Sequence, residues 1–237
     1  MDDIKKLQKI IDESENIVFF GGAGVSTDSG IKDFKGKNGL YKEEYNCQPE
    51  YFLSSKCFYN EPEVFFDFYK FKMNCLEVEP NATHLYLAEL EKAGKLKAVI
   101  TQNIDGLHQK AGSTNVLEIH GTVYKNHCIK CNKEYDAEFV FNSIGVPKCD
   151  CSGIIKPDVV LYGEMLSEAF SLAQNYVFKA DTLIVAGTSL TVEPANGLIK
   201  LFDGKNLIII NNDETPYDKV ATLVINDNLS NVFKNLN

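Results

Sequence analysis

The chain has 237 residues, 44% of them hydrophobic, so it can bury the core of one domain or of a large domain with an insertion. Its net charge of −9 argues against a general nucleic-acid binder, which needs a basic face, and favours lysine-rich partners. No apolar run approaches the roughly 18 residues of a membrane span, and the N-terminus lacks a signal-peptide or transit-peptide pattern. We therefore expect a cytoplasmic protein without nucleic-acid or membrane partners, whose seven cysteines are reduced thiols or metal ligands.

Apolar, β-rich runs alternate with amphipathic stretches along most of the chain. Strands are expected at 16–20, 97–102, 115–120, 158–162, 181–187, 206–211 and 221–226. Helices are expected at 81–94, 167–180 and 228–236. Most of the strands are continuous apolar runs, which is typical of strands buried on both faces of a parallel sheet. The alternation predicts an α/β fold with a doubly wound parallel sheet.

Two segments interrupt the alternation and are expected to form a smaller lobe. The first, 42–78, is aromatic-rich and helical, and the second, 122–157, holds four of the cysteines. The large domain would then comprise 1–41, 79–121 and 158–237.

A glycine-rich turn directly follows the first expected strand, in the stretch FFGGAGVSTDSG at 19–30. Such a turn lets backbone N–H groups approach a pyrophosphate, and the N-terminus of the next helix adds partial positive charge. The pattern around Gly22, Ala23 and Gly24 is incomplete, because Thr27 stands where the dinucleotide-binding motif has its third glycine. A tight turn that serves only packing is therefore an open alternative at this point.

Two close pairs of cysteines are the strongest chemical signal in the chain. Cys128 and Cys131 form one pair, and Cys149 and Cys151 form a second pair that is one residue shorter than usual. This spacing favours a tetrahedral zinc ion, with unliganded thiols or a ligand role for His127 as alternatives. Four thiolates leave no open coordination position, so the metal would stabilise the fold and take no part in chemistry.

Polar side chains also gather where expected strands end. Of the four histidines, His84, His108 and His127 are expected to be structural, whereas His120 ends a strand at the edge where α/β folds bind ligands. The run TQNIDG at 101–106 ends a neighbouring buried strand, although polar residues there can also simply complete a turn. The chain lacks a nucleophile elbow, an H-E-x-x-H zinc site and a Walker loop. The usual hydrolytic motifs are therefore missing.

Several motifs together resemble those of one family, in the family's order and with near-family spacing. They are GAGVSTDSGIKDFKG (22–36), TQNIDGLHQKAG (101–112), EIHGTV (118–123), the cysteine quartet, KPDVVLYGE (156–164), GTSLTVEPA (187–195) and IINNDETPYD (209–218). The family is the sirtuins, NAD-dependent protein lysine deacylases. The resemblance covers nearly the whole chain. It implies a Rossmann-like large domain, with a small domain made of a zinc ribbon and a helical module.

The resemblance also implies roles for individual residues, with NAD and acyl-lysine entering the cleft from opposite sides. His120 would be the catalytic base, and the zinc ligands would be Cys128, Cys131, Cys149 and Cys151. The expected NAD contacts are Gly22, Ala23, Gly24, Asp33, Phe34, Lys35, Gln102, Asn103, Ile104, Asp105, Gly187, Thr188, Ser189, Asn211, Asn228 and Leu229. The expected contacts of the acyl-lysine substrate are Val160, Tyr162, Gly163, Tyr69 and Lys72.

The implied chemistry needs no protein nucleophile, because the acyl oxygen of the substrate itself displaces nicotinamide from the ribose. His120 would then assist deprotonation of a ribose hydroxyl, a role that suits an imidazole. The implied products are nicotinamide, O-acyl-ADP-ribose and free lysine. Two alternatives stay open: transfer of ADP-ribose to a protein, and an NAD-sensing module with weak catalysis.

Some residues depart from the family pattern. Lys35 and Lys156 stand where the family usually has arginine, and Lys32 replaces a proline. Relatives that accept succinyl or malonyl lysine bind the distal carboxylate with a tyrosine and an arginine three residues later. Here those positions hold Tyr69 and Lys72. Because lysine lacks the planar fork of arginine, we expect a preference for acetyl or longer neutral acyl groups.

Overall fold

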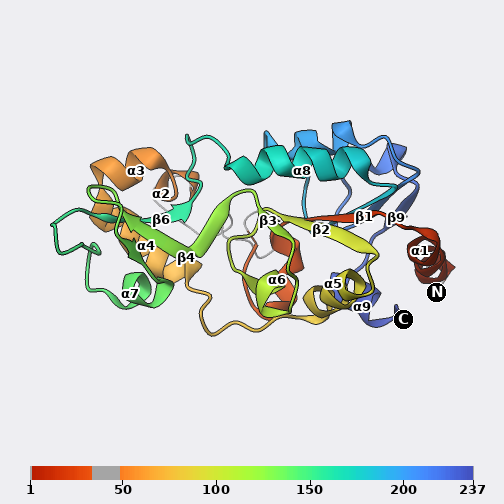
Figure 1. Cartoon of the computed structure of the whole chain (residues 1–237), viewed down its shortest axis with the longest axis horizontal. Helices are drawn as coiled ribbons and strands as arrows, with labels where there is room; N and C mark the ends of the chain where they lie inside the picture. Colours follow the sequence, from red (N-terminus) through yellow and green to blue (C-terminus); the bar gives the residue numbers. More distant parts are fainter. Residues whose placement is uncertain (1, 34–48, 237) are drawn as a thin grey trace.

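The computed structural model describes residues 2–33 and 49–236. Two bodies of unequal size lie along the long axis of the molecule (Figure 1). The larger body contains a six-stranded sheet and the smaller one a three-stranded sheet. Strand β4 (Gly121–Cys128) begins near the large sheet and runs into the small domain.

The large sheet has the strand order β3-β2-β1-β7-β8-β9, and each neighbouring pair is parallel. Its strands are β1 (Ile17–Gly21), β2 (Leu96–Thr101), β3 (Val116–Glu118), β7 (Thr182–Ala186), β8 (Asn206–Ile210) and β9 (Leu223–Ile225). This is the order of the dinucleotide-binding Rossmann fold, in which ligands bind where the strand order reverses. Here the reversal falls between β1 and β7, and the predicted fold class is confirmed.

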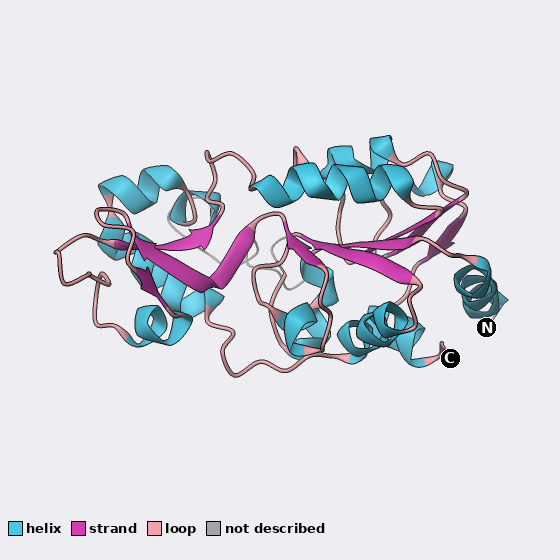
Figure 2. Ribbon diagram, in the orientation of Figure 1, coloured by secondary structure: helices cyan, strands magenta, loops and turns pink. Residues whose placement is uncertain are grey.

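Helices cover both faces of this sheet (Figure 2). One face packs against α1 (Asp2–Glu13), α5 (Ala82–Lys92) and α9 (Leu229–Lys234). The other face packs against α8 (Glu168–Lys179) and the 3₁₀-helix η4 (Ala195–Leu201). Strand β1 explains this layering, because Phe19 belongs to the first core and Phe20 to the second, and every residue of the strand is buried.

Three short helical turns and one capped helix shape the edge of the sheet where the strands end. The turns are η1 (Ala23–Val25) and η2 (Thr27–Ser29), which follow β1, and α6 (Leu107–Lys110), which follows β2. Helix α5 begins at Asn81, whose side chain accepts a hydrogen bond from the backbone N–H of Thr83 at 3.0 Å. A further 3₁₀-helix, η5 (Asp218–Val220), precedes β9.

None of the helices in the described ranges is long and apolar enough to cross a membrane.

The small domain combines an antiparallel sheet with a helical module. Its sheet has the order β5-β4-β6, with β5 (Glu134–Tyr135) and β6 (Ile155–Val159) on either side of β4. Its helices are α2 (Pro49–Phe52), α3 (Ser55–Asn60), α4 (Pro62–Met73) and α7 (Ala137–Asn142). Aromatic side chains from α3 and α4 fill its core, among them the fully buried Phe58, Phe65 and Phe66.

The structure corrects the expected strand at 158–162. The observed strand β6 ends at Val159 and pairs antiparallel with β4 in the small domain, so it is not a strand of the large sheet. Pro157 is tolerated because β6 lies at the edge of the small sheet, where a missing N–H can face away from the ladder. The boundaries expected at 121/122 and 157/158 consequently fall inside β4 and β6.

Candidate active site

Two glycine turns meet at the point where the strand order reverses. The backbone N–H of Gly22 donates to Ala186 O at 3.1 Å, and that of Gly24 donates to Gly187 O at 2.8 Å. A Cβ atom on Gly24 would lie 2.7 Å from the Cα of Gly187, which is closer than atoms can approach. Glycine is thus required here for packing of turn against turn, and the packed turns lie where Rossmann folds bind dinucleotides.

The loop after β2 turns a polar amide toward these turns. Gln102 Oε1 accepts a hydrogen bond from Thr188 Oγ1 at 3.0 Å, and Thr188 directly follows the second glycine turn. Gln102 also lies against the first turn, because a Cβ on Gly22 would come within 2.7 Å of Gln102 Oε1. The side chain of Gln102 is therefore oriented by both glycine turns.

Asp105 fixes the rest of this loop. Its Oδ2 accepts a hydrogen bond from Ser26 Oγ at 2.6 Å, and its Oδ1 accepts one from Leu107 N at 3.0 Å. Ser26 Oγ in turn accepts a hydrogen bond from Asn103 Nδ2 at 3.0 Å. Burial raises the pKa of Asp105, and the hydrogen bonds from Ser26 and Leu107 offset part of this rise. Ser26 is a site residue that no sequence pattern singles out, since a serine in a short helical turn usually only caps it.

His120 lies two residues beyond β3, next to the same loop. Its Nδ1 is 3.0 Å from Gln102 O, and because a carbonyl can only accept, Nδ1 carries the proton. The Nε2 atom of the neutral ring is then a proton acceptor. Burial lowers the pKa of His120, partly opposed by the bond to Gln102 O, so the ring is neutral near pH 7.

The segment 160–163 joins His120 to the small domain. Val160 N donates to His120 O at 2.8 Å, and Tyr162 N donates to Leu53 O at 2.9 Å. Val160 is half-buried, whereas the Tyr162 side chain is 43% exposed. Gly163 has a φ of 94°, which favours glycine. Of the three expected substrate contacts in this segment, Val160 is therefore bonded to His120, and Tyr162 is bonded to the small domain.

Tyr69 does not lie with them. It is 0% exposed and stacks on Phe141 and Phe65, with ring centroids 5.4 and 5.5 Å away. Its hydroxyl has no hydrogen-bond partner in the described part of the chain. Helix α4 turns this face of Tyr69 into the core of the small domain, so its expected role in binding substrate stays a prediction. The Lys72 ammonium lies 4.8 Å from the centre of the Phe71 ring, itself an exposed residue.

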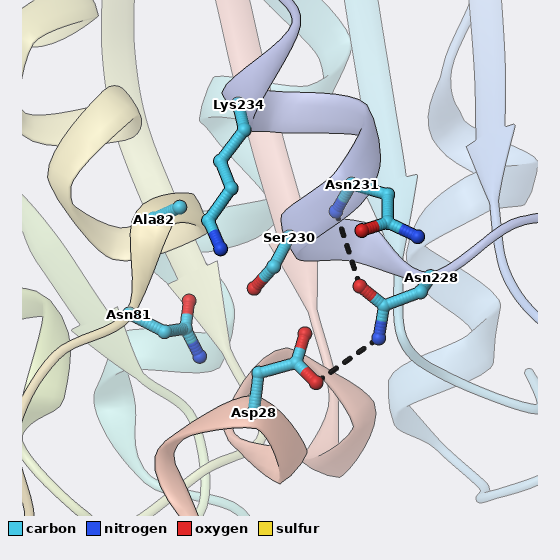
Figure 3. A pocket seen from close by; sticks show the side chains of 7 residues that line it. All are labelled: Asp28, Asn81, Ala82, Asn228, Ser230, Asn231 and Lys234. Carbon is cyan, nitrogen blue, oxygen red and sulfur yellow. Dashed lines mark hydrogen bonds between the residues drawn. The ribbon is translucent and has the colours of Figure 1, made fainter.

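Three of the expected NAD contacts, Asn211, Asn228 and Leu229, follow β8 and β9 at the far end of the sheet edge. Asn228 caps α9 by accepting a hydrogen bond from Asn231 N at 3.1 Å, and its Nδ2 donates to Asp28 Oδ1 at 3.0 Å. Figure 3 shows both bonds at the wall of a polar cavity of about 490 Å³ between η2, α5 and α9. Leu229 is buried in the core, and Asn211 Nδ2 donates to Asp213 O at 2.8 Å. The backbone of Asn228 is bonded as well, because its N–H donates to Asp227 Oδ1 at 2.7 Å and its carbonyl accepts from Val232 N at 3.1 Å.

Four further expected contacts lie in the loops that follow β1, β2 and β7. Ala23 opens η1 and is half-buried, as is Asp33. Ser189 Oγ lies 2.9 Å from Thr191 Oγ1. Ile104 contacts the small-domain core, and its carbonyl accepts from Val123 N at 3.0 Å. Phe34 and Lys35 lie outside the described residues.

The four cysteine sulfurs converge as the spacing predicts. The described residues contain one such group of possible metal ligands, and its four Sγ atoms lie within 4.8 Å of one another. Three of the pairs are 3.5 to 3.6 Å apart. A tetrahedron with Zn–S bonds of about 2.3 Å has edges of about 3.8 Å, so the cluster fits zinc with little adjustment. His127 Nδ1 pairs with Asp158 instead, which leaves the cysteines as the ligand set.

The fold and the residues at the switch point together define a nucleotide-binding protein of the Rossmann class, in which the segment that follows β6 of the cysteine-rich second domain is bonded to His120. The family model that matches the sequence is "Sir2 family", over residues 22–194. The chain belongs to the Sir2 family, the sirtuins.

Curated relatives and solved structures agree with this assignment. The "NAD-dependent protein deacetylase" of Clostridium acetobutylicum is 54% identical over 99% of this chain and 98% of its own length. That of Clostridium perfringens is 55% identical over 98% of each. A Sir2 structure with a deacetylated p53 peptide and 3′-O-acetyl-ADP-ribose has a TM-score of 0.92, is 39% identical, and covers 98% of this chain and 96% of that one. Another, bound to an acetylated peptide, has a TM-score of 0.86 at 38% identity, over 98% of this chain and 95% of that one.

Proposed function

We propose that this protein is an NAD-dependent protein lysine deacetylase that removes acetyl or similar neutral acyl groups. Its products are nicotinamide, O-acyl-ADP-ribose and free lysine. The observation that carries the proposal is the position of His120, whose Nδ1 lies 3.0 Å from Gln102 O beside the glycine turns, and whose own carbonyl binds Val160 N at 2.8 Å. Relatives that share about half their residues with the whole chain support it. Acyl-lysine proteins as partners and a cytoplasmic location complete the proposal.

The residues at the switch point fit NAD. Gly22, Gly24 and Gly187 themselves have no side chains and let the two turns pack closely at the sheet edge, where Rossmann folds bind a pyrophosphate. Gln102 and Asn103 offer amide groups that match a carboxamide and ribose hydroxyls. When bound, NAD supplies a ribose carbon from which nicotinamide can depart. The protein's contribution to this step is to orient the carboxamide and exclude water.

His120 provides the acid–base chemistry of the site. Because Nδ1–H is held by Gln102 O, Nε2 is the atom that can take a proton from a ribose hydroxyl. Burial keeps the ring neutral near pH 7 and therefore ready to act as a base. Asp105 takes no proton in this scheme, since both its oxygens already accept hydrogen bonds, one from Ser26 and one from Leu107.

The cysteine quartet serves the fold of the small domain. With four thiolates as ligands, zinc has no open position for water or substrate. The cluster would hold the hairpin of β4 and β5 against the turn that precedes β6. It would thereby fix the position of β6, from which the segment 160–163 continues past His120.

A single incubation tests the function. The protein is mixed with an acetyl-lysine peptide and NAD labelled in the adenosine part, and the products are separated by mass spectrometry. Deacetylation predicts multiple turnovers, with the label on a small acetyl ester and none on protein. Label transferred to protein would instead indicate a mono-ADP-ribosyltransferase, and NAD binding without turnover would indicate a sensing module.

A further inference from the structure

Lys156 is a buried charge that the reaction does not use. Its side chain is 11% exposed, although it lies in β6 close to the proposed substrate site. The ammonium donates to Pro157 O at 3.3 Å, to Val159 O at 3.2 Å and to Glu164 Oε2 at 3.2 Å. Since an ammonium has three N–H donors, these three acceptors satisfy it completely. Lys156 therefore has no donor left for a substrate.

Glu164 closes a turn that carries two of the proposed substrate contacts. Its backbone N–H donates to Leu161 O at 2.9 Å, and its Oε2 accepts from Leu161 N at 2.9 Å. The turn 161–164 is thus closed twice, by the backbone and by the carboxylate. Gly163 occupies its third position with a φ of 94°, as a type II turn requires. Tyr162, at the second position, is carried outward by this turn.

The lysine and the glutamate together set the path of 157–164. The Lys156 ammonium donates to the carbonyls of Pro157 and Val159, which precede Val160. It also donates to the carboxylate of Glu164, which follows Val160 and closes the turn. Within this span Val160 N is bonded to His120 O, and Tyr162 N to Leu53 O. In the described part of the chain, the other side-chain ion pair of this span joins Asp158 to His127.

We propose that Lys156 and Glu164 are positioning residues for the acyl-lysine substrate. The ion pair fixes the backbone of Val160, Tyr162 and Gly163 in the form that receives the substrate, and it does so without touching substrate or NAD. The inference rests on the proposed deacetylase function. The residues of the glycine turns and of the loop 102–105 lie on other elements, so the NAD side of the cleft does not depend on this pair.

The test separates peptide recognition from NAD recognition. Lys156→Met keeps the length of the side chain but removes its charge, which leaves Glu164 and two buried carbonyls without their donor. We expect the KM for an acetyl-lysine peptide to rise at least fivefold, while the KM for NAD stays within twofold of the parent. Lys156→Arg restores the charge, and we expect its kcat/KM for peptide to return to within threefold of the parent.

Lys95→Met is the matched control. Lys95 Nζ also donates to three backbone carbonyls, those of Ile11, Asp12 and Ser14, but in the large domain at the opposite end of the sheet strands. It should lower thermal stability and change neither KM. A general loss of stability should therefore lower the melting temperature without changing either KM, as in Lys95→Met. Loss of positioning should raise the KM for peptide alone, as in Lys156→Met.

Several outcomes would overturn the proposal. The first is a peptide KM of Lys156→Met that stays within twofold of the parent value. The second is an equal rise of the KM for peptide and the KM for NAD in Lys156→Met. The third is a kcat/KM for peptide that is no higher in Lys156→Arg than in Lys156→Met. If Lys156→Met does not fold, Glu164→Gln must show the same peptide-specific change, and its absence overturns the proposal. Because all values are relative to the parent, an inactive parent contradicts the proposed function and not this inference.

Discussion

Thr188 Oγ1 donates a hydrogen bond to Gln102 Oε1 at 3.0 Å, which links the loops that follow β7 and β2. These loops are 86 residues apart in the sequence and meet over the glycine turns. Because the carbonyl end of the Gln102 amide is held by Thr188, its NH₂ end must point elsewhere in the cleft. The hydrogen bond from Thr188 thus leaves the NH₂ end of this amide for the contact with NAD that we propose.

Thr188→Val should weaken NAD binding without unfolding the protein. Valine keeps the shape of the side chain but cannot donate, so Gln102 is free to rotate. A neutral hydrogen bond contributes about 0.5–1.5 kcal/mol, which corresponds to a rise of roughly two- to tenfold in the KM for NAD. Thr222→Val, the same substitution next to β9 and away from the cleft, should leave this KM unchanged. Equal effects of both variants would contradict the role of Thr188.

His120→Ala should abolish deacetylation while NAD affinity stays within a few-fold. In the proposed reaction the imidazole acts after nicotinamide has left, so it contributes little to ground-state binding, and loss of a general base costs about 10²–10⁴ in rate. The measurements are turnover of an acetylated peptide and NAD binding by calorimetry. An alanine variant with parental turnover would require another base.

The pH dependence of the parent enzyme tests the state of the same ring. Because burial lowers the pKa of His120 below its usual 6.5, the rate should rise with pH along an acidic limb that is centred below pH 6.5. The sign follows from the role, since only the neutral ring accepts a proton. A limb centred above pH 7 would mean that a neighbouring group stabilises the charged ring.

The cysteine quartet should hold one zinc ion per chain that serves folding. Cys128→Ser or Cys149→Ser should release the metal and make the small domain sensitive to protease, because the cluster ties its strands together. Cys57→Ser removes another buried thiol of the same domain and should keep the metal. Metal analysis and limited proteolysis measure both effects. The zinc site would be contradicted if the purified parent protein contains no metal and the serine variants melt at the same temperature as the parent.

Two buried histidines should make the fold sensitive to acid. The rings of His84 and His108 are 4.7 Å apart and almost fully buried. Burial lowers the pKa of His84 to about 4; burial and the nearby His84 lower that of His108 well below its usual value. The unfolded chain binds these protons below about pH 6.5 and the folded chain does not. The free energy of unfolding should therefore fall as the pH drops from 6.5 toward 4.

His108→Leu tests this effect, since neither ring nitrogen of His108 has a hydrogen-bond partner in the described ranges. Between pH 7.5 and pH 5 the parent should lose about 2 kcal/mol more unfolding free energy than the variant. Denaturant titrations at the two pH values give the difference. Equal losses in both proteins would show that His108 is protonated in the folded state.

The sequence predicted what depends on local pattern. Continuous apolar runs indicated the strands of the large sheet, and the cysteine spacing indicated the metal cluster. The pattern could not show that β6 belongs to the small sheet, since an apolar run does not reveal its partner. Nor could it find the bond between Ser26 and Asp105, which are 79 residues apart. The positions of such pairs depend on how the strands are ordered, and that is a property of the whole fold.

The chain should prefer neutral acyl groups, and the burial of Tyr69 strengthens the reason. A distal carboxylate needs hydrogen-bond donors, but the Tyr69 hydroxyl lies in the small-domain core between Phe65 and Phe141. Transfer of an ionised carboxylate out of water without a partner is costly. A single lysine offers a mobile point charge in place of a bidentate fork, so Lys72 does not replace the missing pair.

We expect kcat/KM for an acetyl peptide to exceed that for the succinyl version of the same peptide by at least tenfold. Lys72→Arg should not reverse this order, because Tyr69 cannot leave the core to complete a clamp. Tyr69→Phe serves as the control: it removes a hydroxyl that has no partner among the described residues, so both rates should stay within twofold of the parent. Succinyl turnover equal to acetyl turnover in the parent would contradict the preference for neutral acyl groups. Succinyl turnover that is lost specifically in Tyr69→Phe would show that the tyrosine contacts the acyl group.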